Sequence, residues 1–365
     1  MRDRVKKIFA KAQKELDALV FVNSVEPHLD QTFFYVTDVA SGLFEGCAAV
    51  AFPDGKVEVF TSELEAESAR TAPDVKVNVF TTRDDENSQL KRLLGNSKRI
   101  GLNFHEITYE SFLSVKKGFP STEWEDVTEA VRKTRSIKDA KEIERLRIAG
   151  RIGTKVAEEI PSMLKTGMTE LELAAEMEYR MNIHGAAGRS FGTIVAFGAH
   201  GAEPHFTPTG TKLEKGTTMV CDFGALYQRY CSDITRSYAF GKPSAEAKAI
   251  HDKVEEAQQA ALATIGAGVA AKEPHLAAQK VIDASPWKGR FIHGLGHSIG
   301  LAVHDGFSLN GRNEELLEEG MCVTVEPGIY VPGLGGVRIE DDILVTKKGY
   351  EFLTTAPRGY LEVGR

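Results

Sequence analysis

Two aspartates face each other across a predicted β-hairpin in the middle of the chain. Residues 219–240 read as two strands of apolar and β-branched residues with a short turn near Tyr227 and Gln228. A hairpin folded there would set Asp222 directly opposite Asp233 on the same face. Because like charges in opposed positions destabilise a sheet, the pair predicts a positive partner between them, most simply a metal ion.

A second predicted hairpin repeats this arrangement nearer the C-terminus. Residues 321–345 contain the turn sequence PGLGG, and folding about Gly333 would place Glu326 opposite Glu340. The alternative for one such hairpin is a pair of solvated surface charges. Two hairpins with opposed acids favour a common site for all four carboxylates.

A glycine-rich segment between the hairpins, residues 291–305, adds His293, His297 and His304. Carboxylate and imidazole groups are ligands for hard and borderline divalent cations. Four carboxylates with one imidazole suit two such ions that share bridging oxygens. The residue types therefore predict a dinuclear metal site.

The contexts of these residues, DFG, SDITRS, GHSIG, VEPG and RIED, resemble the ligand motifs of the pita-bread metallopeptidases. That family includes Xaa-Pro aminopeptidase, Xaa-Pro dipeptidase (prolidase), methionine aminopeptidase and the metal-free creatinase. The resemblance covers roughly the last two thirds of the chain, and a weaker likeness to the creatinase-type N-terminal domain covers the first third. It implies metal ligands at five positions: Asp222, Asp233, His297, Glu326 and Glu340.

The resemblance also implies separate roles within the site. Asp233 and Glu340 would bridge the two ions, and Glu326 would accept and pass on the proton of the shared hydroxide that attacks the scissile carbonyl. His205, in PHFTPT, and His304, in VHD, match family histidines near the substrate. A histidine there would donate to the developing oxyanion or the departing nitrogen. A purely structural position is the alternative for both.

Three further residues are candidates for substrate binding. His293 matches a family histidine that lines the pocket, and Arg338 shares a strand face with Glu340, whose carboxylate it could neutralise or orient. Many dipeptidase relatives carry an arginine, which pairs with the dipeptide's carboxylate, where this chain has Ser308. Arg312, four residues further on, is the candidate substitute.

We therefore expect an Xaa-Pro dipeptidase of the prolidase type, with an Xaa-Pro aminopeptidase acting on longer peptides as the alternative. A non-catalytic pita-bread binding protein is the alternative from another class, but such members lose metal ligands and this chain keeps all five. The expected cofactors are two divalent ions per chain, manganese or cobalt first, then zinc or iron. The expected partners are a peptide with proline after the scissile bond and, as the resemblance implies, a second copy in a homodimer.

Composition excludes several other classes of protein. The 365 residues carry 45 basic and 52 acidic side chains, for a formal charge of −7, whereas nucleic-acid-binding proteins are usually basic. The N-terminal segment is a charged amphipathic helix rather than a signal peptide, and no apolar run reaches membrane-spanning length. The four cysteines lack CxxC spacing and are typical of reduced thiols. We expect a cytoplasmic protein that binds neither membrane nor nucleic acid.

The first 133 residues alternate strand and helix and predict a small α/β domain, a lid or oligomerisation domain without a catalytic cluster. Its strands are predicted at residues 18–22, 33–36, 48–52, 56–60, 75–80 and 99–103, and its helices at 63–70, 86–94, 109–117 and 127–132.

Residues 134–365 predict an α+β catalytic domain in which helices alternate with the ligand-bearing strands. The resemblance implies a curved antiparallel sheet with helices, in two pseudo-equivalent halves. The first two helices would begin with capping boxes, Ser136 with Asp139 and Thr169 with Glu172. Two more helices are predicted at residues 245–265, after the cap Ser244, and at 273–284. The sequence GRSFG at residues 188–192 matches a nucleophile elbow, but an apolar strand follows where that motif needs a helix.

Overall fold

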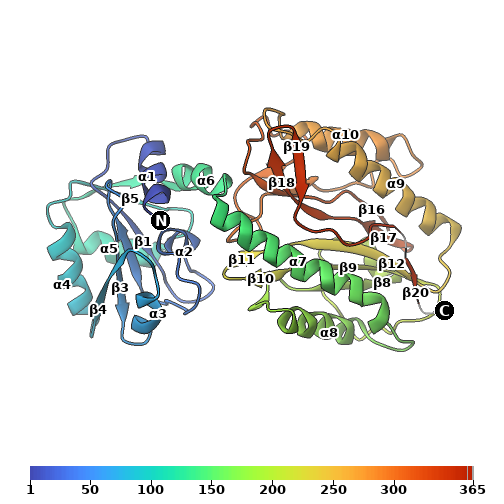
Figure 1. The fold of residues 1–365 in the computed structure, drawn as a ribbon, viewed down its shortest axis with the longest axis horizontal. Coiled ribbons are helices and arrows are strands. Elements are labelled where there is room, and N and C mark those ends of the chain that lie inside the picture. The colour runs from blue at the N-terminus through green and yellow to red at the C-terminus, as the bar shows by residue number, and fades with distance from the viewer. Residues whose placement is uncertain (360, 364–365) are drawn as a thin grey trace. The chain divides into compact units, whose positions relative to one another are not determined.

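Two units, Met1–Arg135 and Ser136–Arg365, make up the chain in the computed structural model, which describes residues 1–359 and 361–363 (Figure 1). All four cysteines are buried free thiols. Among the described residues, no helix has the length and apolar character needed to cross a membrane.

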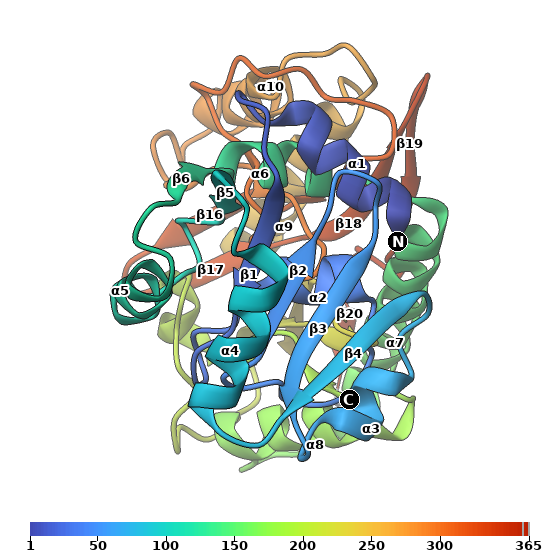
Figure 2. The same ribbon diagram turned by 90° about the vertical axis from the view of Figure 1, so that its left-hand side faces the viewer.

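The first unit is built on a six-stranded sheet with the order β4-β3-β2-β1-β5-β6, seen face-on in Figure 2. The pairs β1–β2 and β2–β3 are antiparallel and the other neighbours are parallel. The strands are β1 (Ala18–Val22), β2 (Ala48–Ala51), β3 (Val57–Ser62), β4 (Val75–Phe80), β5 (Arg99–Leu102) and β6 (Glu123–Asp126).

Helices cover both faces of this sheet. Apolar side chains of α4 and α5 pack on one face, and α1 and α2 lie on the other (Figure 1). The helices are α1 (Arg2–Lys11), α2 (Gln31–Thr37), α3 (Ala66–Arg70), α4 (Arg83–Leu94), α5 (Tyr109–Gly118) and α6 (Thr128–Ser136). The burial of both sheet faces gives this unit the predicted α/β architecture.

The predicted strand at residues 33–36 is wrong, because this segment lies within helix α2. The aromatic and β-branched run favours a strand, but the Asp30 side chain accepts a hydrogen bond from the amide of Thr32 and caps a helix there. All side chains from Thr32 to Thr37 are buried, so no solvent-facing stripe marks the helical period. Strand β6 was not predicted from the sequence, because this short edge strand is charged and partly exposed and so lacks the apolar pattern of a buried strand.

The second unit begins with a half made of two helices and a largely antiparallel sheet. Helices α7 (Ala140–Met163) and α8 (Glu170–Ile183) pack against β8, β9 and β12 around one apolar cluster (Figure 1). The order of the main sheet is β20-β12-β9-β8, in which β20 (Leu361–Val363) runs parallel to β12 and the other neighbours are antiparallel. The strands of this half are β7 (Gly188–Arg189), β8 (Ile194–Phe197), β9 (Thr217–Phe223), β10 (Ala225–Tyr227), β11 (Tyr230–Cys231) and β12 (Ile234–Phe240), and a 3₁₀ turn, η1 (Gly198–Ala202), follows β8.

The other half repeats this plan with α9 (Ala245–Leu262) and α10 (Lys272–Asp283), which pack on a second apolar cluster. The two halves confirm the predicted pita-bread arrangement of helices around curved antiparallel sheets (Figure 1). The remaining strands are β13 (Gly296–His297), β14 (Ser308–Leu309), β15 (Cys322–Val325), β16 (Gly328–Val331), β17 (Gly335–Arg338), β18 (Asp341–Thr346), β19 (Gly349–Phe352) and β20 (Leu361–Val363).

One of the two predicted capping boxes is misplaced. Asp139 is itself the N-cap of α7 and forms a capping box with Glu142, whereas the prediction put the cap at Ser136. The capping box of Thr169 with Glu172 at the start of α8 is confirmed. A carboxylate can cap a helix as well as a hydroxyl can, so either residue fitted the pattern.

The first site hairpin turns at Gln228 and Arg229, one residue later than predicted. Both have positive φ, 45° and 71°, as two-residue hairpin turns require. Asp222 consequently lies opposite Thr235, and the predicted direct pairing with Asp233 is wrong. The observed partner of Asp222 is two residues beyond the predicted one, and a strand repeats its faces every two residues. The two aspartates therefore keep the same face of the hairpin and lie diagonally across it.

The second hairpin has the predicted register. Strands β16 and β17 pair symmetrically about Gly333, and β15 and β18 continue the same register, with Val325 opposite Asp341. Glu326 and Glu340 occupy the break between these two ladders and are therefore set across from each other.

Candidate active site

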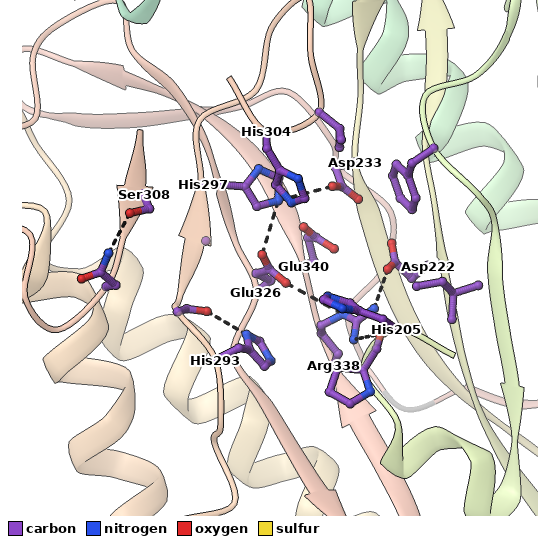
Figure 3. A pocket seen from close by; sticks show the side chains of 17 residues that line it. His205, Asp222, Asp233, His293, His297, His304, Ser308, Glu326, Arg338 and Glu340 are labelled. Atoms are coloured by element: carbon purple, nitrogen blue, oxygen red, sulfur yellow. Dashed lines mark hydrogen bonds and ion pairs between the residues drawn. The ribbon is translucent and has the colours of Figure 1, made fainter. Parts of the chain in front are cut away.

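A cavity of about 410 Å³ in the second unit collects nine of the ten predicted site residues (Figure 3). Its polar lining comes from both halves of the unit, and apolar side chains of Phe191, Ile194 and Val303 also line it. The predicted residues in the lining are His205, Asp222, Asp233, His293, His297, His304, Glu326, Arg338 and Glu340.

Strand ends and strand breaks present the acids to this cavity. Asp222 lies on β9, and Asp233 stands directly before β12. Glu326 follows β15, and Glu340 lies between β17 and β18. His297 is the last residue of the short strand β13. Two paired β-segments per half thus fix the acids through backbone hydrogen bonds rather than through flexible loops.

The central group of the site consists of Asp233, His297 and Glu340, each with a ligand atom within 4.8 Å of the others'. The Nε2 atom of His297 is 3.7 Å from Oδ2 of Asp233 and 3.5 Å from Oε1 of Glu326. These separations are longer than hydrogen bonds. They leave room between the side chains for a cation, which these groups would hold.

Unpartnered oxygens support the same interpretation. One carboxylate oxygen each of Asp222, Asp233 and Glu340 is buried without a hydrogen-bond partner. A buried carboxylate oxygen ordinarily has a donor or a cation beside it, because desolvation without a partner is costly. The carboxylates and the imidazole of His297 are a donor set that fits divalent metal ions.

The protonation of the acids depends on the charges beside them. Burial raises the pKa of Glu326 to about 8 despite the nearby Arg338 cation. Burial, followed by the neighbouring carboxylates, also raises the pKa of Asp233 and Glu340 well above their ordinary values. Acids that crowd together in a buried site cannot all ionise without a compensating charge, and divalent ions supply it.

The ring of His297 is held in the tautomer that a metal ligand needs. Its Nδ1 atom lies 3.3 Å from the carbonyl oxygen of Ser298, which can only accept, so Nδ1 carries the proton. Burial, with His304 acting in the same direction, lowers the pKa of His297 to about 4. The lone pair of Nε2 is therefore available toward Asp233 and Glu326.

Arg338 is a buried cation that connects two of the acids. Its guanidinium donates to Oδ2 of Asp222 directly, and its Nε donates to the hydroxyl of Thr235 at 3.0 Å. That hydroxyl donates in turn to Glu340 at 2.5 Å. Arg338 thus contacts Asp222 directly and reaches Glu340 only through Thr235. The sequence had suggested that Arg338 neutralises or orients Glu340, two residues away on the same strand face.

A chain of hydrogen bonds extends from Arg338 to His293. The guanidinium donates to the Tyr330 hydroxyl at 3.0 Å, and this hydroxyl lies 2.9 Å from Nε2 of His293. The Nδ1 of His293 is 2.7 Å from the carbonyl oxygen of Gly294, so Nδ1 donates and Nε2 accepts from Tyr330. Burial lowers the pKa of His293 to about 4, which keeps this ring neutral.

His304 and His205 lie at the open side of the cavity and both are exposed. The ring of His304 meets that of His297 edge-on, with centroids 4.2 Å apart (Figure 3). Burial, with His205 acting in the same direction, lowers the pKa of His304. Both histidines can therefore offer a nitrogen to a ligand in the cavity without being fixed by the acids.

Arg312 is the one predicted site residue outside this cavity. It is exposed and lines an adjoining open hollow of about 650 Å³. The hollow shares His293, Gly294 and Asn310 with the cavity, so the two spaces adjoin at these residues. Ser308 lies in the cavity lining at this end.

Several supporting residues escaped the sequence analysis, Tyr330 and Thr235 among them. Thr324 accepts from the amide of His297 at 3.1 Å, and Asp342 accepts from the amide of Asp233 at 2.8 Å. Thr324 lies on β15 two residues before Glu326, and in an extended chain this spacing places both side chains on one face, which could have indicated Thr324. The contacts of Thr235 with Glu340, of Asp342 with Asp233 and of Tyr330 with His293 join segments far apart in the sequence.

The serine of the GRSFG sequence has a structural role. The Ser190 hydroxyl donates to the carbonyl oxygen of Ser232 at 2.8 Å, and strand β8 follows it rather than a helix. This hydroxyl joins β7 to the hairpin that carries Asp233, which agrees with the prediction that the sequence is not a nucleophile elbow.

Comparison with known proteins places the whole chain among peptidases. An uncharacterized peptidase of Staphylococcus haemolyticus is 41% identical over 260 residues, which are 69% of this chain and 74% of that one. The structure of an Xaa-Pro dipeptidase from Bacillus anthracis superposes with a TM-score of 0.91 at 31% identity and covers 99% of both chains. That of an X-Pro aminopeptidase from Thermotoga maritima gives 0.89 at 34% identity, covering 95% of this chain and 97% of that one.

Family models match both units. The model of the creatinase/prolidase N-terminal domain matches residues 2–137, and that of metallopeptidase family M24 matches residues 144–347. The resemblance inferred from the ligand motifs is therefore confirmed. The chain belongs to metallopeptidase family M24, as a peptidase that uses divalent metal ions and carries a creatinase/prolidase-type N-terminal domain.

Proposed function

We propose that this protein is an Xaa-Pro dipeptidase that hydrolyses the peptide bond before proline with two divalent ions. The observation that carries the proposal is the set of buried acids with unpartnered oxygens around His297. It is joined by the likeness, over nearly the whole chain, to enzymes described as Xaa-Pro dipeptidase and X-Pro aminopeptidase. A non-catalytic binding protein would have no need to retain such a costly cluster of acids.

Five residues would hold the ions: Asp222, Asp233, His297, Glu326 and Glu340. Asp233 and Glu340, which lie in the central group with His297, are the proposed bridging ligands. When bound, two divalent ions supply a water acidic enough to act as hydroxide near neutral pH and polarise the scissile carbonyl. Manganese and cobalt are our first candidates, with zinc and iron as alternatives.

Side chains of the protein would transfer the proton and stabilise the negative charge that develops on the substrate. Glu326, whose carboxyl is easily protonated in this environment, would take up a proton and return it to the departing proline nitrogen. His304 and His205, at the open side of the cavity, would donate to the developing oxyanion or to the leaving group. The Arg338 guanidinium would hold the Asp222 carboxylate in place through a direct hydrogen bond.

The hollow beside the cavity bears on substrate length. In a dipeptide, the carboxylate follows one residue after the scissile bond and needs a cation. Arg312 is the proposed partner, because the hollow that it lines adjoins the cavity at His293 and Asn310. The openness of the same hollow favours the second candidate, an Xaa-Pro aminopeptidase whose longer substrates would extend past Arg312.

A substrate comparison with Arg312→Ala distinguishes the two candidates. A charge-assisted hydrogen bond contributes about 1.5–3 kcal/mol, roughly 10- to 150-fold in kcat/KM. With the manganese-loaded protein, we expect Arg312→Ala to weaken Ala-Pro cleavage by that factor and Ala-Pro-Ala cleavage much less. Lys280→Ala, which removes an exposed cation of α10 outside the lining, is the control and should change neither. A wild type that prefers the tripeptide, with no selective loss in the variant, would assign the protein to the aminopeptidases.

A further inference from the structure

One buried carboxylate outside the cavity holds both ends of the loop that carries His205. Glu170, the first residue of α8, is fully buried. Its Oε1 accepts from the amide of Phe197 and from Nδ1 of His200, each at 2.8 Å. Its Oε2 accepts from the amide of Thr209 at 2.9 Å and from the hydroxyl of Thr209 at 2.6 Å. A single side chain thus closes the loop of residues 197–209.

The start of α8 strengthens this closure. The backbone amide of Glu170 donates to the carbonyl of Thr211, and that of Leu171 donates to the carbonyl of Thr209, both at 3.2 Å. Amides in the first turn of a helix have no partner within the helix, so here they bind the end of the loop at Thr209 and Thr211. The loop and the helix end therefore form one hydrogen-bonded unit.

The contacts of Glu170 lead to His205 through its neighbours. The His200 ring, held by Glu170, stacks on Phe206 with centroids 4.3 Å apart. On the other side of His205, the carbonyl of Pro204 accepts from Arg338 at 3.3 Å. The backbone position of the exposed His205 is thus set by the contacts of its two neighbours, Pro204 and Phe206.

We propose that Glu170 is a positioning residue that sets the place of His205 in the active site. The inference rests on the proposed function, in which His205 faces the substrate. Glu170 itself does not line the cavity, so its effect would pass through the loop. Misplacing a participating group by about 1 Å costs on the order of 10²-fold in rate, so a loosened loop should lower turnover more than substrate binding.

A double-mutant cycle on the manganese-loaded protein tests this role. Glu170→Gln replaces one acceptor oxygen by a donor at the same volume and should lower kcat on Ala-Pro by about 10- to 100-fold with little change in KM. In a His205→Ala background, the same substitution should change kcat by less than about 3-fold, because the two residues would act as one unit. Equal losses in both backgrounds would overturn the proposal.

Amide hydrogen exchange gives a readout that does not depend on activity. We expect Glu170→Gln to speed the exchange of loop residues 197–209 by about 10-fold or more and to leave β9 and β12 unchanged. Unchanged loop exchange would refute the hold of Glu170 on the loop. A wild type inactive on Xaa-Pro peptides, with faster loop exchange in the variant, would instead refute the proposed function alone.

Two further variants guard against a misfolded protein. Thr209→Val removes the hydroxyl that donates to Glu170 and that also accepts from the amide of Thr211 at 3.2 Å, but it keeps the Glu170 carboxylate. It should act in the same direction with a smaller loss, about 3- to 10-fold. Glu159→Gln is the matched control: Glu159 also pairs with a histidine, His184, at 2.8 Å, but this pair does not contact the loop. It should leave kcat and loop exchange as in the wild type, and a loss equal to that of Glu170→Gln would contradict the proposal.

Discussion

At the scale of single residues, the role of each histidine depends on which of its ring nitrogens already forms a hydrogen bond within the protein. His297 gives its Nδ1 proton to a backbone carbonyl and His293 gives its own to Gly294. Tyr330 occupies the remaining nitrogen of His293, whereas Nε2 of His297 lies 3.7 Å from a carboxylate oxygen of Asp233 and 3.5 Å from one of Glu326. Two similar histidines therefore differ in role, since only His297 keeps a lone pair for a cation.

The role of His304 differs from those of His293 and His297. Its removal should impair catalysis without a loss of bound metal. His304→Ala should keep the bound ions, because the ring contacts His297 edge-on and lies at the exposed side of the cavity. Turnover on Ala-Pro should fall by roughly 10²-fold or more, the scale of a lost acid–base or oxyanion group. Steady-state kinetics with elemental analysis of the same sample checks both. A loss of metal in the variant would make His304 a ligand and would contradict its assignment.

At the scale of elements, the two hairpins place the acids, and glycine lets the first hairpin close. Gly224 stands across from Asp233, where a Cβ atom would lie 1.8 Å from the carbonyl oxygen of Ser232. The amide of Ala225 donates to the Ser232 hydroxyl, which secures the same narrow crossing. The position of Asp233 thus depends on a close approach of two backbones.

Gly224→Ala should therefore displace Asp233. The added methyl group meets backbone rather than a flexible side chain, so we expect a loss of about 1–3 kcal/mol in the free energy of unfolding together with weaker metal binding. Gly188→Ala, in the neighbouring strand β7, is the control, since a Cβ there meets nothing within 4 Å. Denaturant unfolding and metal titration of both variants would measure this, and equal behaviour of the two would contradict the account.

The same elements show what a sequence can and cannot predict. The register of the second hairpin was predictable because the PGLGG turn has one obvious centre at Gly333. The first hairpin has no glycine in its turn, so its centre was misplaced by one residue, and only the two-residue period of a strand kept Asp222 and Asp233 on one face. The supporting contacts of Thr235 and Tyr330 depend on how distant strands pack, which local patterns do not encode.

At the scale of the whole molecule, the site lowers the stability of the second unit unless cations are bound. The raised pKa values of Glu326, Asp233 and Glu340 mean that their ionised forms are disfavoured in the folded, metal-free protein. Bound ions reverse this, because they require deprotonated ligands and bind only the folded state. Folding and metal binding should therefore be linked through pH.

The stability of the metal-free protein should fall as pH rises from about 6.5 to about 8. A carboxyl whose pKa is raised on folding, such as Glu326 at about 8, binds more protons in the folded state, so deprotonation favours unfolding. Histidines with lowered pKa, His293 and His297, act in the opposite direction but only below about pH 6.5. Thermal melts of chelated protein should show this decline, Glu326→Gln should reduce it, and the metal-loaded protein should show none. A flat profile for the chelated wild type would contradict the linkage.

The central claim, a dinuclear centre bridged by Asp233 and Glu340, is tested most directly by counting ions. Elemental analysis of manganese-loaded, desalted protein should give two ions per chain for the wild type and for the control Asp252→Ala, which removes a surface acid of α9 paired with Lys248. Asp233→Ala and Glu340→Ala should each lose both ions, because each removes a ligand that the two metals share. Two ions per chain in either of these variants would contradict the bridging roles on which the account rests.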